Sequence, residues 1–393
     1  GYNAMSANTG GSENAAVGRN SMLSNTTGAN NAALGNGALY SNTTASYNTA
    51  VGSSALLSNT TGAENTAVGY EAGGDITTGS NNTAVGAKAL DVATTGDDNT
   101  AVGGDALGAC TTASNNTAVG RNALAANTTG TQNVSVGTAA LDANTTASYN
   151  TAVGYNALGA NTTGAENVAI GVQALTACTT TDANVAIGAS AQTQSTTSEK
   201  CVSIGYLAGY QITTGDNNIC LGTDAGRTGS PGGAVQTASN QLCLGDENIT
   251  HSFVQVDWTI SSDQRDKTDF ADLDIGLDFV KALEPVTYKW DKRSKYIGKD
   301  DPSADLDTVT HDGTHKEDWL DVGFKAQAVE ALEKAAGYTL SDKTNLVTSL
   351  TENGKQYGLQ YSKFVPILVK AVQELSAEVE ELKAQPKCKC QGD

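Results

Sequence analysis

The chain has 393 residues and is acidic, with 42 Asp and Glu residues against 23 Lys and Arg residues and a formal net charge of −19. A nucleic-acid partner needs basic surface to meet its phosphates, so this balance argues against one. No apolar run approaches the ~20 residues that a membrane-spanning helix needs, and we expect no membrane insertion. The seven cysteines have no zinc-like spacing, and neither a metal nor another cofactor is predicted.

Composition divides the chain near Ser262. Ala, Asn, Thr and Gly dominate before that residue, whereas most of the tryptophan and dense charge follow it. We therefore predict a repeat shaft over residues 1–245, a neck over 246–262 and a second domain over 263–393. The chain opens at Gly1 in repeat-like sequence without Met, which favours a fragment or a processed product.

A 17-residue repeat runs through the first part, and its core reads Asn-Thr-Ala-Val-Gly in most copies. A late copy at residues 241–245 follows a six-residue insertion. A helical repeat unit needs about 33 residues, so a period of 17 favours one coil of a parallel β-solenoid. The core glycine recurs without a slip at Gly18, Gly35, Gly52, Gly69, Gly86, Gly103, Gly120, Gly137, Gly154, Gly171, Gly188, Gly205 and Gly222.

Two core positions predict how each coil packs. The fourth is always aliphatic, as in Val17, and the third is always small, as in Ala16. Neighbouring residues of a strand face opposite sides, so we expect the aliphatic position to fill the interior and the small position to meet a second chain closely. A second short strand is predicted at the Ala-Leu pair, for example residues 38–39. Such a thin core is marginal alone, which indicates association around a symmetry axis.

The Asn-x-Ala-Val/Ile-Gly coils of residues 14–245 resemble the head repeats of trimeric bacterial adhesins of the YadA type. This resemblance implies a left-handed parallel β-roll in a homotrimer. The period departs from that family, whose repeats are usually about three residues shorter. We expect the additional Thr-Thr-Gly turn to enlarge one corner of the coil.

Three patterns within the repeat admit other functions. The column of Thr-Thr pairs suggests an ice-binding surface, but such a surface needs two outward threonines separated by one residue. Neighbouring threonines point to opposite sides, so ice binding is not favoured. Asp75, Asp97 and Asp98 could suggest a carboxylate pair for glycoside cleavage, but we interpret them as solvated turn residues. The repeat explains six formal N-glycosylation acceptors as stacked Asn and Thr ladders, at Asn25, Asn42, Asn59, Asn127, Asn144 and Asn161.

The cysteines of the repeat occupy positions that other copies fill with Asn or Ala. Cys110 and Cys178 replace the asparagine of the Asn-Thr-Thr triplet, and Cys220 and Cys243 replace the small residue of the core. We expect all four to be small buried fillers. Two further cysteines, Cys388 and Cys390, could crosslink chains, although free thiols are expected there.

After the repeat ends, the sequence predicts a small α+β domain. A short helix over 275–283 ends before Pro285, a strand follows over 286–290, and a second helix runs from 326 to about 336. A hairpin turn at 352–355 joins strands within 346–350 and 356–360. The last helix, about 364–384, carries a short coiled-coil seam with alternating spacings of three and four at Val365, Leu368, Val372, Leu375, Val379 and Leu382.

The segment at residues 262–267 holds the only candidate catalytic pair. Ser262 is followed five residues later by Lys267, which is the minimum for a serine–lysine dyad. A lysine that has lost its proton can serve as the base that activates a hydroxyl. The spacing alone is a weak signal, because a charged surface loop would look the same.

Four segments of the second part together resemble the C-terminal intramolecular chaperone of phage tail spikes and fibres, the self-cleaving endosialidase type. They are Ser262-Asp263-x-Arg265-x-Lys267, Leu283-x-Pro285-Val286-x-Tyr288-x-Trp290, Gly323-Phe324-x-Ala326-Gln327, and Tyr357-Gly358-Leu359-x-Tyr361-Ser362-x-Phe364-Val365-Pro366.

The resemblance covers residues 258–386 and implies a trimerising chaperone that cuts itself between Ser262 and Asp263. It makes Ser262 the nucleophile and Lys267 the base, with Asp263 and Arg265 positioning the loop. Asp266 departs from the apolar residue expected there, and a carboxylate at that place would favour the charged lysine and slow cleavage.

These observations favour a mainly β homotrimer, with a parallel β-solenoid shaft followed by an α+β domain that ends in a coiled-coil helix. The predicted function is a phage tail fibre segment, located in the virion, that meets an unknown glycan or protein receptor on the host surface. A bacterial surface adhesin with the same chaperone is the alternative. A polysaccharide-cleaving spike is less favoured, because the repeat carries no catalytic constellation.

Overall fold

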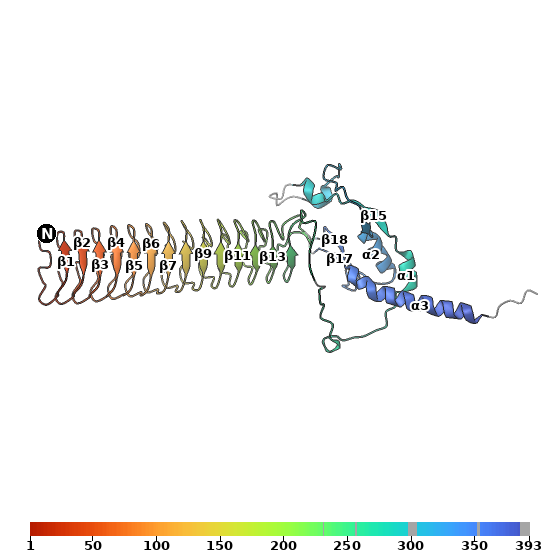
Figure 1. The fold of residues 1–393 in the computed structure, drawn as a ribbon, viewed down its shortest axis with the longest axis horizontal. Coiled ribbons are helices and arrows are strands. Elements are labelled where there is room, and N and C mark those ends of the chain that lie inside the picture. Colours follow the sequence, from red (N-terminus) through yellow and green to blue (C-terminus); the bar gives the residue numbers. More distant parts are fainter. Residues whose placement is uncertain (231, 256–257, 298–304, 352–353, 386–393) are drawn as a thin grey trace, which may run out of the picture. The chain divides into compact units, whose positions relative to one another are not determined.

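The computed structural model describes residues 1–230, 232–255, 258–297, 305–351 and 354–385. The chain divides into two compact units, Gly1–Asp246, here called the shaft, and Glu247–Asp393, here called the C-terminal unit. Each unit is described by itself. Figure 1 shows the strands of the shaft stacked in chain order along one side of successive coils. They are β1 (Ala15–Val17), β2 (Ala32–Leu34), β3 (Thr49–Val51), β4 (Thr66–Val68), β5 (Thr83–Val85), β6 (Thr100–Val102), β7 (Thr117–Val119), β8 (Val134–Val136), β9 (Thr151–Val153), β10 (Val168–Ile170), β11 (Val185–Ile187), β12 (Val202–Ile204), β13 (Ile219–Leu221) and β14 (Leu242–Leu244).

The shaft is a parallel β-solenoid, as the repeat predicts. Each strand pairs in register with the strand one coil further on, so that Ala101 of β6 lies beside Ala118 of β7. All fourteen strands form one sheet in chain order. Its handedness stays a prediction of the resemblance to YadA-type heads.

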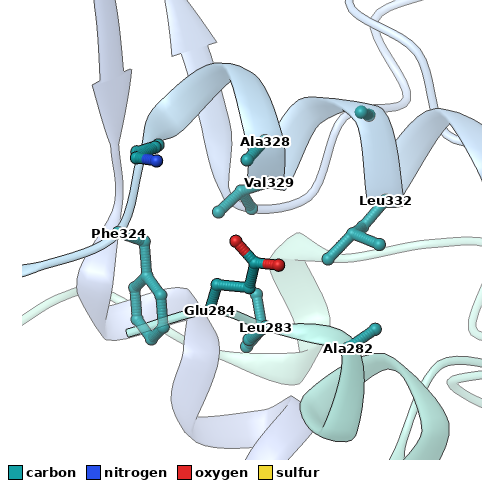
Figure 2. Close-up of a pocket in the computed structure, with 9 residues that line it drawn as sticks. Ala282, Leu283, Glu284, Phe324, Ala328, Val329 and Leu332 are labelled. Atoms are coloured by element: carbon teal, nitrogen blue, oxygen red, sulfur yellow. The ribbon is translucent and has the colours of Figure 1, made fainter. Parts of the chain in front are cut away.

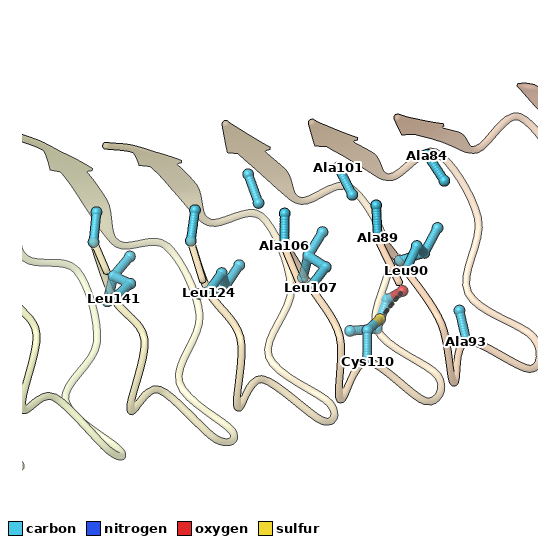
Figure 3. Close-up of a cluster of buried hydrophobic side chains, with 14 of the residues drawn as sticks. Ala84, Ala89, Leu90, Ala93, Ala101, Ala106, Leu107, Cys110, Leu124 and Leu141 are labelled. Carbon is cyan, nitrogen blue, oxygen red and sulfur yellow. Dashed lines mark hydrogen bonds between the residues drawn. The ribbon is translucent and has the colours of Figure 1, made fainter. Parts of the chain in front are cut away.

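The small residue of the strand, and not the aliphatic residue after it, fills the interior of each coil. The prediction that the aliphatic position faces the interior was therefore wrong. Ala101 is fully buried, whereas Val17 is 60% exposed and Val68 is 38% exposed. Figure 3 shows Ala101 directed into the same interior as the buried Leu107 of its own coil. Because a leucine from the opposite side occupies this narrow space, the strand has room only for alanine. The small position therefore does not meet a second chain.

The Ala-Leu pair forms a turn instead of the predicted second strand. Leu107 has φ +51° and Asp105, two residues earlier, has φ +57°. Two left-handed residues so close together bend the chain sharply, at a cost of order 1–3 kcal/mol each. The surrounding coils hold this conformation, because Leu107 is fully buried and its N–H donates to the carbonyl of Ala123 at 3.0 Å.

Asparagine ladders satisfy the polar interior of the turns. The backbone N–H of Asn116 donates to Oδ1 of Asn99 at 3.1 Å, and its side-chain amide donates to the carbonyl of Gly130 at 2.9 Å. The asparagines of the Asn-Thr-Thr triplets form a second ladder, in which Asn42 donates to Oδ1 of Asn25 at 2.8 Å. The six asparagines of the Asn-Thr-Thr triplets are all fully buried, so none of these six offers an accessible amide for glycosylation.

The Thr-Thr pairs present one column to water, as strand alternation predicts. Thr94 donates its hydroxyl to the carbonyl of Thr111 in the next coil at 3.1 Å, whereas its neighbour Thr95 is exposed. Asp97 lies in an exposed turn and accepts the backbone N–H of Ser80 at 2.7 Å, which agrees with a turn residue.

The core glycine is required by the close approach of successive coils. Gly103 has φ +136°, and a Cβ atom built on it would lie 2.5 Å from the carbonyl oxygen of Gly120. Any side chain would therefore push the coils apart. The four cysteines predicted as fillers are buried and free of disulfides, whereas Cys388 and Cys390 lie outside the described residues.

The C-terminal unit contains the predicted elements around one small core. It has two antiparallel strand pairs, Val286–Tyr288 with Asp321–Gly323 and Thr348–Leu350 with Tyr357–Leu359. Residues 352–353 of the predicted hairpin turn lie outside the described residues. The core consists of Ile275, Phe279, Val329, Val347, Phe364 and Ile367. The elements are α1 (Leu277–Ala282), β15 (Val286–Tyr288), β16 (Asp321–Gly323), α2 (Ala326–Ala335), β17 (Thr348–Leu350), β18 (Tyr357–Leu359) and α3 (Phe364–Ala384).

Two glutamates tie these short elements together. Glu333 of α2 is fully buried, and its carboxylate accepts the backbone N–H groups of Leu346, Val347 and Thr348 at 2.7, 2.6 and 3.2 Å. Glu374 of α3 accepts the N–H of Leu277 at the start of α1 at 2.7 Å, and this hydrogen bond lowers the pKa of the glutamate. Each carboxylate thus replaces backbone partners that such short elements lack.

Candidate functional site

A single 3₁₀ turn, Gln264–Asp266, shapes the candidate site. Asp263 precedes this turn, and its Oδ1 accepts the backbone N–H of Arg265 at 2.9 Å. The Arg265 guanidinium also donates to this carboxylate, from Nε to Oδ1 at 3.1 Å and from Nη2 to Oδ2 at 2.6 Å. These hydrogen bonds hold the pKa of Asp263 below its ordinary value and raise that of Arg265. The pair therefore fixes the turn between the two candidate catalytic residues.

The turn brings Ser262 and Lys267 into contact. Nζ of Lys267 lies 2.5 Å from the hydroxyl of Ser262 and 3.3 Å from the carbonyl oxygen of the same serine. The backbone N–H of Lys267 donates to the carbonyl of Gln264 at 3.2 Å, which closes the turn and directs the lysine back along the chain. The residues named from the sequence thus gather in one loop, and all of them are exposed in the single chain.

This arrangement provides two parts of an acyl-transfer site. A neutral Lys267 amine is placed to accept the proton of the Ser262 hydroxyl. The charged form is placed to polarise the carbonyl at the predicted scissile bond. The second contact was not expected from the sequence, because a spacing of five residues does not show where the lysine meets the backbone.

Asp266 lies in the turn without engaging the lysine directly. Within the described ranges, no ion pair joins Asp266 to Lys267. Any effect of this carboxylate on the lysine therefore acts through space and not through a direct contact.

A cavity of about 210 Å³ lies between the end of α1 and the face of α2. Leu283, Phe324, Val329 and Leu332 line it, and Figure 2 shows the Glu284 carboxylate directed toward Val329 among these apolar side chains. No pattern in the sequence indicates this cavity, because its lining comes from segments some forty residues apart.

The described residues contain neither a cluster of metal ligands nor a membrane-spanning helix. No group of three or more His, Cys, Asp or Glu side chains is placed there to hold a metal ion. No helix in this part of the chain is long and apolar enough to cross a bilayer.

Comparison with known proteins identifies the C-terminal unit. Residues 262–338 match the family model described as chaperone of endosialidase, and the match begins at the serine of the candidate dyad. No curated relative matches the chain. The chain therefore carries a chaperone-of-endosialidase domain behind a parallel β-solenoid shaft.

Proposed function

We propose that this chain is a segment of a homotrimeric tail fibre of a tailed phage, whose shaft extends toward a glycan or protein receptor on the host surface. In this proposal the C-terminal unit assembles three chains and then releases itself by cutting between Ser262 and Asp263. One observation carries the proposal: a chaperone-of-endosialidase domain follows a shaft whose row of aliphatic strand residues is exposed at eight positions and half-buried at the other six.

The aliphatic stripe supports association of the shaft with other chains. It consists of the last residue of each strand, which is Val, Ile or Leu in all fourteen, and is here called the outer stripe. Val17 is 60% exposed at one end and Leu244 is 48% exposed at the other. Soluble monomers rarely expose a contiguous apolar surface of such extent, so the outer stripe fits an interface between shafts.

The C-terminal unit has its own uncovered apolar surfaces. The six seam residues of α3 are exposed, although Phe364 and Ile367 on another face of the same helix are buried in the core. In the segment before the dyad, Phe253 and Trp258 are exposed as well. Both surfaces fit contacts with the other chains of a trimer.

Assembly would also prepare the dyad for cleavage. Lysine acts as a base only as the neutral amine, and removing water from its surroundings favours that form. The loop is exposed in the single chain, so packing of neighbouring chains over it would supply that change. Cleavage would then report that the trimer has formed.

The reaction itself is an acyl transfer between chains. A serine hydroxyl that attacked its own carbonyl would close a four-membered ring, so Ser262 attacks the Ser262 carbonyl of a neighbouring chain. Lys267 takes the hydroxyl proton and delivers it to the departing nitrogen of Asp263. Water then hydrolyses the ester between the chains and leaves Ser262 as the new C-terminus of each shaft.

Intact mass measured over time tests this proposal. The native chain should give a shaft ending at Ser262 and a released piece of 131 residues (393 − 262). Ser262→Ala and Lys267→Ala should each abolish cleavage while the trimer persists, and Ser261→Ala is the matched control that should cut normally. Cleavage that continues in Ser262→Ala would remove the nucleophile assignment. A shaft ending at Ser261 would indicate attack by Ser262 on the preceding carbonyl instead.

A bacterial surface adhesin remains the second candidate, because the parallel solenoid is also the architecture implied by the YadA-type repeats. Neighbouring genes for phage tail proteins would favour the fibre, and genes for cell-surface export would favour the adhesin.

A further inference from the structure

Among the described cysteines, two are stacked directly on one another at the end of the shaft. The register of β13 and β14 pairs Cys220 with Cys243. The other three, Cys110, Cys178 and Cys201, each have a residue other than cysteine at the same position of the neighbouring coils. The stacked pair is therefore distinct from the isolated fillers.

The strand spacing at this pair suits a disulfide. Strands paired in register lie about 4.8 Å apart, within the range of about 4.4–6.8 Å between the Cα atoms of bonded cysteines. Both side chains point into the shaft interior, and both thiols are free. The interaction between the two thiols lowers the pKa of Cys243 and raises that of Cys220.

The last coil also differs in length and in backbone conformation from those before it. The chain between the two cysteines carries the six-residue insertion, so this coil departs from the 17-residue period. Gly222 after β13 has φ +111°, whereas Gly205 one coil earlier has φ +136°. Cys243 lies on the last strand of the sheet, so no further strand pairs beyond it, and its side chain is 6% exposed.

We propose that Cys220 and Cys243 form a redox-responsive disulfide that staples the last coil to the shaft. A small disulfide such as oxidised glutathione supplies the oxidising equivalents. The Cys243 thiolate attacks one sulfur of this compound and releases one small thiol. The Cys220 sulfur then attacks Sγ of Cys243 and releases the second. Two protein thiols are oxidised and one small disulfide is reduced to two thiols.

The staple would stabilise the end of the shaft from which the chain leaves the solenoid. The last coil has a sheet partner on one side only, and terminal units open most readily. A covalent bond between residues 220 and 243 closes the insertion coil into a ring and restricts that opening. This role holds for a fibre or an adhesin alike.

Peptide mapping of the full chain provides a direct test. The protein is incubated with oxidised glutathione, its remaining thiols are alkylated after denaturation, and trypsin is added without reductant. Arg227 is the only tryptic site between the two cysteines, so the bond should join peptides 201–227 and 228–265. Cys220→Ala, which restores the usual residue of the column, should abolish the link. Cys201→Asn restores the usual residue at the other cysteine of the same peptide and should leave the link intact.

A second measurement tests the consequence for the shaft. Oxidation should slow cleavage of the native protein after Arg227 by about tenfold or more, because that cut requires the last coil to open. Addition of reductant should reverse the protection, and Cys220→Ala should show neither effect. Full alkylation of both cysteines after prolonged oxidation would overturn the proposal, as would a bond that survives in Cys220→Ala.

Discussion

The shaft and the C-terminal unit are stabilised by different kinds of interaction. Most coils of the shaft are stabilised in the same way, with Ala and Leu in the interior and hydrogen-bond ladders through the Asn and Thr columns. The C-terminal unit repeats nothing and has one small core, tied together by the carboxylates of Glu333 and Glu374. Both nevertheless leave apolar surface uncovered.

Under the proposed trimer assembly, this difference explains why the two regions belong in one chain. Identical coils make a slip by one repeat nearly neutral in energy, so three shafts packed on their outer stripes, as proposed above, would have no intrinsic register. A unique domain at one end can align three chains before the coils pair. Long parallel pairings form slowly, which makes such alignment most useful early in folding.

Removing the C-terminal unit should have the largest effect. A gene truncated after Ser262 lacks the domain that is proposed to align the chains, so its product should form aggregates or monomers and not soluble trimers. Sedimentation of the expressed product measures this. Soluble trimers from the truncated gene would show that the shaft assembles without the chaperone-of-endosialidase domain.

Glu333→Ala should be the most damaging single substitution in the C-terminal unit. Three backbone N–H groups would lose their acceptor, and each buried unsatisfied donor costs about 1–3 kcal/mol, so we expect a loss of about 3 kcal/mol or more. All three tryptophans lie after the shaft, so their fluorescence in urea follows this unit alone. Lys334→Gln, at an exposed position of the same helix, is the control and should change little.

Enlarging the small residue of a strand should destabilise the shaft by an intermediate amount. Ala101→Leu forces extra volume into a filled interior and should cost about 1–3 kcal/mol. Thr95→Leu places the same side chain at an exposed position of the preceding turn and should cost about 0.5 kcal/mol or less. Thermal melting followed by the β-sheet circular dichroism compares them. Equal melting temperatures would contradict the assignment of the interior.

Asp263→Asn should have the smallest effect. It removes the charge that holds Arg265, and exposed ion pairs contribute little, so cleavage should slow by about fivefold at most. Arg265 keeps the pKa of Asp263 below its ordinary value, so the pair is present at neutral pH and is lost only as pH falls through that lowered value. The difference between native and variant cleavage rates should therefore persist down to about pH 4. A difference that vanishes near pH 6 would assign the effect to another group.

The 17-residue period was sufficient to predict the parallel solenoid, and the motifs after Ser262 were sufficient to predict the chaperone domain and the loop that holds Ser262 and Lys267. The direction of the strand side chains was predicted wrongly. Alternation shows that Ala101 and Val102 face opposite sides but not which side is interior, and the space for Val102 is occupied by Leu107 from a turn that looked like a strand. The role of Glu333 was not visible either, because its partners lie thirteen to fifteen residues away in a hairpin.

The number of chains in the assembled protein is the most direct test of the account. Val and Leu alternate along the seam of α3, and this pattern by itself favours a two-stranded coiled coil. A trimer would therefore be contrary to what the seam alone predicts. Native mass spectrometry of Ser262→Ala, which should not be cleaved, measures the mass of the intact assembly. The account predicts a single species at three times the 40.0 kDa of the chain. A species at twice that mass, or a stable monomer, would contradict it.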